Sequence, residues 1–288
     1  MSSTLYALAA IALWATLASL GTALSHLPPF LLTGLALMIG SVLSWPLVLR
    51  DRTAWAVPAP TLALGIYGLF GFHFLLFIAL RHAPPVEANL VNYLWPLFMV
   101  VLAPVFLSGV SLRAVHVMAA LLGFAGAAVA ILGAAHSGHS ADRAASAASG
   151  GAYWGFLPAL GSAFIWASYS LGSQRVTAFP TAAIGLFGLV SGALSLACHA
   201  LLEPAAALSS RDWVLVTLCG LGPLGAAFFF WDMALKRGDA RQIGILSYIT
   251  PLASTALLLQ VTGRPLSWSI VLAAALILSA AMLGRRAS

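Results

Sequence analysis

The chain alternates between long apolar stretches and short polar breaks. Short breaks rich in Pro and charged residues, such as Pro28-Pro29 and Glu203-Pro204, are typical of turns between antiparallel neighbours in a helix bundle. A helix needs about 20 apolar residues to cross the hydrocarbon core of a bilayer. Ten stretches reach or approach that length: 4–24, 30–49, 60–80, 85–107, 113–133, 152–173, 181–202, 212–235, 241–260 and 266–284. The pattern therefore predicts an all-α polytopic membrane protein with ten transmembrane helices.

One apolar stretch carries more polar groups than a lipid-facing helix would. Residues 86–107 read VEANLVNYLWPLFMVVLAPVFL, with Asn89, Asn92, Tyr93 and Trp95 in the first half. Each unpaired polar group in hydrocarbon costs several kcal/mol, so these side chains are expected to face protein or a cavity. They share one side of a helix at spacings of three and four residues. The sequence therefore predicts that this side forms one wall of a binding cavity.

The second half of the chain repeats the first. Ala-Leu-Arg at 79–81 and Tyr-x-x-Pro at 93–96 recur 155 residues later as Ala-Leu-Lys at 234–236 and Tyr-x-x-Pro at 248–251. Each half holds five apolar stretches, and because five is odd the second half must enter the membrane inverted. Inverted repeats are the plan of many secondary transporters, whose substrate site lies near the midplane where the halves meet.

This repeat sets the expected domain boundaries. Residues 1–133 form the first five-helix repeat and 152–288 the second, with Trp14 of the first helix matching Trp166 of the sixth. Between them, 134–151 reads AAHSGHSADRAASAASGG, a composition that predicts a flexible periplasmic linker.

Composition and charge narrow the class further. The chain is 61% hydrophobic and 7% charged, whereas soluble domains carry about 25% charged residues. Its net charge of +6 comes without a basic cluster, so no nucleic-acid partner is expected. Nine of the 13 Lys and Arg residues fall on the side that holds both termini, which predicts that both termini are cytoplasmic. No P-loop, HExxH, GxSxG or paired CxxC motif is present, and the sequence implies no cofactor, no metal and no obligatory protein partner.

The remaining candidates for chemistry lie within the apolar stretches. His73 is central in the third, where a neutral imidazole is tolerated and can still make hydrogen bonds. Glu87 and Asp232 lie near the membrane interfaces, where solvation or pairing with Arg81 or Lys236 is expected. The predicted substrate-binding residues are Trp14, His73, Asn89, Asn92, Tyr93, Trp95, Trp166, Tyr169, Ser247 and Tyr248. Pro96 and Pro251, which each remove a backbone hydrogen bond, are the predicted hinges.

The paired motifs also carry a family resemblance. Ten helices in two inverted halves, with Ala-Leu-Arg/Lys before the fourth and ninth helices and Tyr-x-x-Pro inside both, resemble the EamA-type branch of the drug/metabolite transporter superfamily. The likeness implies a basket of ten helices in a bacterial inner membrane, exporting amino acids or related metabolites through a central cavity lined from helices three, four, eight and nine. The matching positions are Trp14, His73, Tyr93, Trp95, Trp166 and Tyr248. Much of the family has Glu directly before both prolines, where this chain has Trp95 and Thr250.

The leading hypothesis is therefore an exporter of aromatic and other neutral amino acids that works by alternating access. The first alternative is a drug/proton antiporter for lipophilic compounds, which proton-gradient dependence of flux would distinguish. An integral-membrane enzyme acting on lipids or quinones would need clustered His or acidic residues at one interface, and here they are scattered. A sensor without net flux is a third alternative.

Overall fold

All the regular secondary structure in the part of the chain that the structure describes is helical. This structure is a computed structural model, and it describes residues 2–137, 153–262 and 268–286. The helices are α1 (Ser3–Ala15), α2 (Leu17–Ala23), α3 (Pro29–Ser41), α4 (Trp45–Arg50), α5 (Ala59–Ile66), α6 (Phe72–His82), α7 (Pro85–Asn92), α8 (Trp95–Phe106), α9 (Ala114–Ser137), α11 (Phe156–Gly172), α12 (Ala183–Leu202), α13 (Ser210–Leu221), α14 (Ala227–Leu235), α15 (Ala240–Ser247), α16 (Ile249–Thr262) and α17 (Trp268–Arg286). Short 3₁₀ or π-helical turns join some of them: η1 (Val42–Ser44), η2 (Arg52–Trp55), η3 (Tyr67–Gly71), η4 (Tyr153–Gly155) and η5 (Gly222–Ala226).

Neighbouring elements combine into longer apolar rods. Within the described residues, seven rods are long and apolar enough to cross a membrane: Ser3–Ala23, Pro29–Arg50, Ala59–His82, Pro85–Phe106, Ala114–Gly133, Ala183–Leu202 and Ser210–Leu235. Trp268–Gly284 forms a shorter apolar helix. These lengths agree with the expected class of polytopic membrane protein, whereas the count of ten crossings stays a prediction. Helix α9 runs to Ser137, and residues 138–152, which hold most of the predicted linker, lie outside the described residues.

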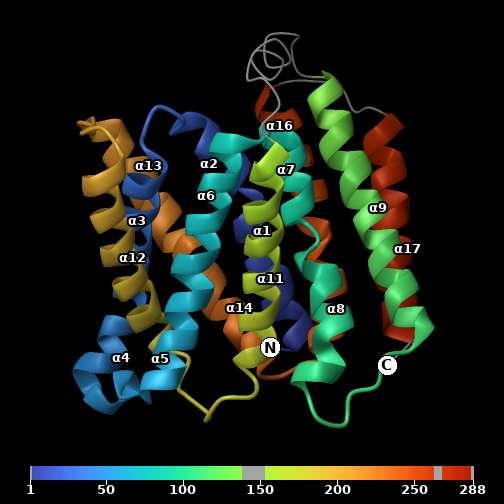
Figure 1. Cartoon of the computed structure of the whole chain (residues 1–288), viewed down its shortest axis with the longest axis horizontal. Helices are drawn as coiled ribbons and strands as arrows, with labels where there is room; N and C mark the ends of the chain where they lie inside the picture. Colours follow the sequence, from blue (N-terminus) through green and yellow to red (C-terminus); the bar gives the residue numbers. More distant parts are fainter. Residues whose placement is uncertain (1, 138–152, 263–267, 287–288) are drawn as a thin grey trace.

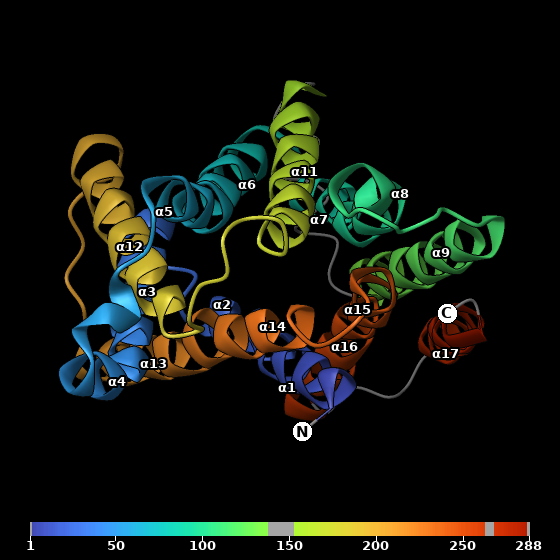
Figure 2. The same ribbon diagram turned by 90° about the horizontal axis from the view of Figure 1, so that it is seen from below.

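The rods pack side by side as a bundle with two end faces. Figure 1 shows the start of α1 and the end of α17 at the same end of the bundle, which we call the terminal face; the other end is the opposite face. Figure 2 shows α9 and α17 side by side at one edge, and α3, α12 and α13 grouped at the other. Glycines allow α3 and α12 to approach closely, since a Cβ added to Gly192 would lie 2.8 Å from the carbonyl oxygen of Gly34.

Irregular backbone recurs at matching positions in the two halves. The π-helical turns η3 and η5 begin at residues 67 and 222, and α7 and α15 end at residues 92 and 247, each pair 155 residues apart. The predicted single helix over 86–107 is in fact two helices, because Tyr93 and Leu94 interrupt it before Pro96. Pro96 therefore lies in the first turn of α8, where a missing N–H disturbs no helical hydrogen bond. The hinge role of both prolines stays a prediction.

Candidate functional site

A cavity of about 490 Å³ lies inside the bundle, between its middle and the opposite face. Its lining comes from the end of α1 and from α2, the start of α3, one side of α6, the last turn of α7 and the start of α8, together with parts of α11, α13, η5, α14 and α16. Ala18 and Gly21 on its wall are exposed, so the cavity is not sealed on that side. Seven of the ten predicted binding residues line it: Trp14, His73, Asn89, Asn92, Tyr93, Trp95 and Trp166.

Tryptophan rings form the floor of the cavity. The ring of Trp14 lies 5.8 Å from that of Trp166 in an edge-on arrangement and 5.2 Å from that of Trp231. Trp95 contacts the same Trp231 ring at 5.5 Å. Aromatic pairs at such distances contribute about 0.5–1.5 kcal/mol each beyond burial. The floor is therefore a rigid aromatic surface that joins helices of both halves.

Hydrogen bonds fix two of these indoles. Nε1 of Trp14 donates to the carbonyl oxygen of Pro223 at 3.1 Å, within the π-helical turn η5. Nε1 of Trp231 donates to Oγ of Ser170 at 3.1 Å. Trp231 is 1% exposed and supports the floor from below rather than lining the cavity, and no motif in the sequence marked it as a supporting residue.

Helix α7 supplies the polar wall. Asn92 is 6% exposed, and its Oδ1 accepts a hydrogen bond of 2.8 Å from Oγ of Ser162 on α11. Because the carbonyl oxygen of the amide is already engaged, its NH₂ group is the part left to act as a donor. Asn89 and Tyr93 line the cavity beside it. The wall can therefore present amide donors to a carboxylate.

His73 presents an acceptor to the cavity. Its Nδ1 lies 2.6 Å from the carbonyl oxygen of Leu69, and because a carbonyl only accepts, Nδ1 must carry the hydrogen. In the neutral ring Nε2 is then an unprotonated acceptor, suited to an ammonium group. The imidazole is held edge-on between Phe72 at 5.0 Å and Phe228 at 6.4 Å.

The remaining wall uses residues that the sequence marked only weakly. Thr250 and Ser254 on α16 and Thr33 on α3 line the cavity with hydroxyl groups. Ser247, Thr250 and Ser254 follow one another at helical spacing on the ninth apolar stretch, and the last two of these hydroxyls line the cavity. Cys219 is buried and free and also reaches the cavity wall.

Three predicted binding residues lie outside the cavity. Tyr169 packs against Trp166 at 5.4 Å and covers Gly68. Ser247 is fully buried and donates to the carbonyl oxygen of Gly244 within its own helix. Tyr248 is also fully buried, with its ring in a notch left by Gly123 on α9. The structure thus places one wall of the cavity on α7, whereas the matching face of α15 is packed against other helices.

Dense packing closes the bundle between the aromatic floor and the terminal face. Ala10, Met99 and Ala103 have no exposed surface, and Leu235 is 3% exposed. All four belong to the same apolar cluster as the floor tryptophans.

Basic residues of the second half fasten the terminal face to the first half. Nη1 of Arg241 donates to the carbonyl oxygen of Ser111 at 2.7 Å, and the guanidinium of Arg237 lies 5.1 Å above the ring of Tyr6. Asp239 orients Arg241 through an ion pair of 2.6 Å. Burial acts to raise the pKa of Asp239, but the hydrogen bonds and charge of Arg241 outweigh it and hold that pKa below its usual range.

The two acidic residues singled out in the sequence have ordinary surroundings. Asp232 is buried near the terminal face and pairs with Lys236 at 2.7 Å, as expected, while Thr181 donates to the same oxygen at 2.6 Å. Glu87 is exposed in the first turn of α7. Neither residue lines the cavity.

Comparison with known proteins gives one consistent family. A model of the EamA-like transporter family matches residues 1–132 and 153–284. A relative from Ancylobacter novellus, named aromatic amino acid exporter YddG, is 42% identical over 97% of this chain and 96% of its own length. One of the same name from Escherichia coli is 28% identical over 93% of this chain and 91% of its own length. A crystal structure of a protein 38% identical to this chain superposes with a TM-score of 0.87 over 99% of this chain and 98% of that one. The resemblance predicted from the paired motifs is confirmed.

Proposed function

The chain belongs to the EamA-like transporter family, and from this premise we propose that it exports aromatic and other neutral amino acids across a bacterial inner membrane. The observation that carries the proposal is the character of the cavity. Its volume of about 490 Å³ falls within the range of about 300–1,000 Å³ typical of small-molecule sites. Its described lining combines aromatic rings, amides, hydroxyls and an imidazole, with no Asp, Glu, Lys or Arg.

The lining suits a zwitterion with a large apolar side chain. The side chain packs against the floor of Trp14, Trp95 and Trp166, where aromatic contacts add to the gain from burial. Nε2 of His73 accepts from the ammonium group, and the NH₂ groups of Asn89 and Asn92 donate to the carboxylate. An ionised side chain would find no partner and would lose its hydration, so Asp, Glu, Lys and Arg are poor substrates.

The halves form an inverted repeat of five membrane crossings each. Support comes from the offset of 155 residues between the π-helical turns, between the ends of α7 and α15, and between the two Tyr-x-x-Pro motifs. The seven apolar rods and the shorter α17 are compatible with this plan. The helix breaks of the two halves lie next to each other, since a Cβ added to Gly244 on α15 would meet the carbonyl oxygen of Pro96 on α8 at 3.3 Å, and paired discontinuous helices are a feature of such transporters.

The terminal face is cytoplasmic. Among the residues whose side chains the structure describes, the Lys and Arg at helix ends on this face are Arg50, Arg52, Arg113, Arg175, Lys236, Arg237 and Arg241. On the opposite face they are Arg81 and Arg211. An excess of Lys and Arg marks the cytoplasmic side of membrane proteins. The cavity then lies in the outer half, and the conformation is outward-facing.

Alternating access follows from these two halves. In the outward-facing state the floor and the packed terminal half separate the cavity from the cytoplasm. Loading substrate requires the contacts of Arg237 and Arg241 with the first half to open, while the outer ends of α6, α7 and α3 close over the cavity. Pro96 and Pro251, next to the helix breaks, are where α7–α8 and α15–α16 bend.

Flux measurements test the proposal. Proteoliposomes containing the protein are expected to take up labelled Phe, Trp, Met and Thr faster than empty vesicles, and Asp and Lys no faster. Uptake equal to that of empty vesicles for every amino acid would contradict the proposal. An imposed proton gradient separates facilitated export from the drug/proton antiport alternative, which needs flux to follow the gradient.

A further inference from the structure

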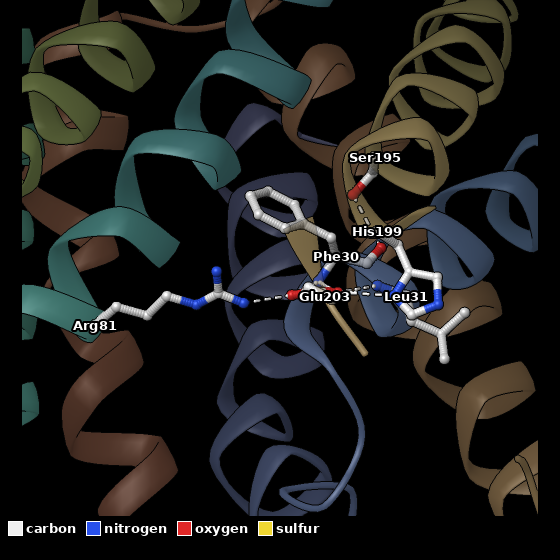
Figure 3. Close-up of polar contacts among 6 residues, drawn as sticks. All are labelled: Phe30, Leu31, Arg81, Ser195, His199 and Glu203. Atoms are coloured by element: carbon white, nitrogen blue, oxygen red, sulfur yellow. Dashed lines mark hydrogen bonds and ion pairs between the residues drawn. The ribbon is translucent and has the colours of Figure 1, made fainter. Parts of the chain in front are cut away.

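One buried carboxylate joins three helices at the outer end of the bundle. Glu203 directly follows α12, and its side chain has no exposed surface. Its oxygens accept hydrogen bonds from Nη2 of Arg81 on α6 at 2.7 Å and from Nδ1 of His199 on α12 at 3.0 Å (Figure 3). Arg81 and Glu203 belong to different halves of the chain, so this ion pair connects the halves across the outer face.

The same carboxylate caps helix α3. The helix begins after Pro28, it has no side-chain cap of its own, and its first free N–H groups belong to Phe30 and Leu31. The N–H of Phe30 lies 3.1 Å from both oxygens of Glu203, and that of Leu31 lies 3.3 Å from one of them. The first turn of a helix leaves unsatisfied donors and a partial positive charge, so a carboxylate stabilises it.

Phe30 connects this cap to α6. Its ring lies 5.7 Å from Phe74 and 5.4 Å from Phe77, and the guanidinium of Arg81 lies 5.7 Å above it. Its carbonyl oxygen accepts from Oγ of Ser195 on α12 at 3.0 Å (Figure 3). One residue is therefore held by α12 through its backbone and by α6 through its ring.

The residues adjoining this cluster line the cavity. Leu32 and Thr33 follow on α3, and Phe77 and Leu80 come from the last turns of α6. The arrangement is also costly to break, because Arg81 is 41% exposed and can be solvated alone, whereas Glu203 would be left as a buried charge without its strongest partner.

We propose that Glu203 is a positioning residue of the transport cycle, which keeps the outer ends of α3 and α6 at the separation that leaves the cavity open. Losing the Arg81–Glu203 pair frees the outer end of α6 to close over the cavity. This inference rests on the proposed function for two points only: which face of the bundle is the outer one, and that the opening and closing serve transport. It concerns the equilibrium between open and closed forms, which can be measured without any substrate.

Cysteine accessibility tests the proposal directly. Gly21 lines the cavity, and a Cβ added there would meet no atom within 4 Å, so Gly21→Cys gives a reporter in a background of Cys198→Ala and Cys219→Ala. A membrane-impermeant maleimide is added to right-side-out membrane vesicles. Glu203→Gln and Arg81→Met are each expected to slow labelling by about tenfold, the equilibrium effect of losing a hydrogen bond to a charged group.

Matched variants separate positioning from general loss of stability. Arg81→Lys retains the charge and is expected to restore most of the labelling rate. Arg211→Gln removes an exposed cation from the same face outside the cluster and is expected to leave the rate unchanged. Unchanged labelling in Glu203→Gln and Arg81→Met, with only a lower Tm, would overturn the proposal. If Glu203→Gln fails to fold, Arg81→Met decides, because it leaves the cap on α3 intact. Slower labelling in a protein that moves no amino acid would leave the positioning role standing and reject the proposed function.

Discussion

Removing the hydroxyl of Ser162 tests whether Asn92 must be held in place to bind substrate. Oγ of Ser162 donates to Oδ1 of Asn92 at 2.8 Å, and the two residues are 0% and 6% exposed. Leaving a buried acceptor unpaired costs about 1–3 kcal/mol. The same hydroxyl lies 2.8 Å from the carbonyl oxygen of Ala159, so its single hydrogen serves two acceptors and the lower end of that range applies. For Ser162→Ala we therefore expect the apparent KM for phenylalanine to rise by roughly fivefold, the equivalent of about 1 kcal/mol.

A double-mutant cycle in proteoliposomes checks this reasoning. Asn92→Ala is expected to raise KM further, and adding Ser162→Ala to it should change nothing more, because Ser162 acts only through Asn92. The control is Ser168→Ala, which removes another buried hydroxyl from α11, one that lies 2.8 Å from the hydroxyl of Tyr67 away from the cavity. It should lower Tm while KM stays the same. Additive effects of Ser162→Ala and Asn92→Ala, or a KM change in Ser168→Ala as large as in Ser162→Ala, would refute the positioning of Asn92.

Further predictions follow from glycine contacts, the terminal face and topology. Gly68→Ala places a Cβ against the ring of Tyr169 and should cost about 1–3 kcal/mol of stability by overpacking, seen as a lower Tm, whereas Gly21→Ala should not. Arg241→Met removes the donor to the carbonyl oxygen of Ser111 and should increase labelling of a cysteine at Ala103 from the cytoplasmic side; a labelling rate equal to the parent's would argue against a role in closing that face. Reporter tags on the two termini should both be protected in right-side-out vesicles, and exposure of either one would contradict the proposed orientation.

The cavity could be predicted because hydrocarbon penalises polar groups. Asn89 and Asn92 have no reason to occupy an apolar stretch unless a cavity or protein partner satisfies them, and the structure places both on the cavity wall. The same logic found His73. Tryptophan gave a weaker signal, since Trp14, Trp95 and Trp166 line the cavity whereas Trp231 supports them from behind, and both roles look alike in a sequence.

Matching residues of the two halves have different surroundings in this conformation, and the binding roles of Tyr248 and Ser247 stay predictions. Tyr93 and Tyr248 occupy matching positions, yet only Tyr93 lines the cavity, and Tyr248 fills the notch at Gly123. An open cavity on one face necessarily gives equivalent residues of the two halves different surroundings. Ser247 differs from Asn92 for the same reason.

Glu203 could not be recognised from the sequence. Next to Pro204, Glu203 looks like an ordinary charged residue of a loop. The backbone groups that it caps, at Phe30 and Leu31, are 173 and 172 residues away in the sequence. Capping by a distant side chain depends on how α12 and α3 pack, and no local pattern encodes it. The start of α3 itself was predictable, because prolines such as Pro28 and Pro29 are favoured at the beginning of a helix.

The paired π-helical turns keep the rods that follow them in register with the cavity. In an α-helix each residue turns the chain by about 100°, and a wide turn holds one residue more than a regular turn, so η3 absorbs a rotation that would otherwise carry all of α6 round by that amount. Closing this turn to a regular one without removing a residue would rotate Phe72 and His73 away from the cavity. The same holds for Phe228 after η5. The width of these two turns, more than any side chain on them, thus decides which residues of the following rods form the inner surface of the protein.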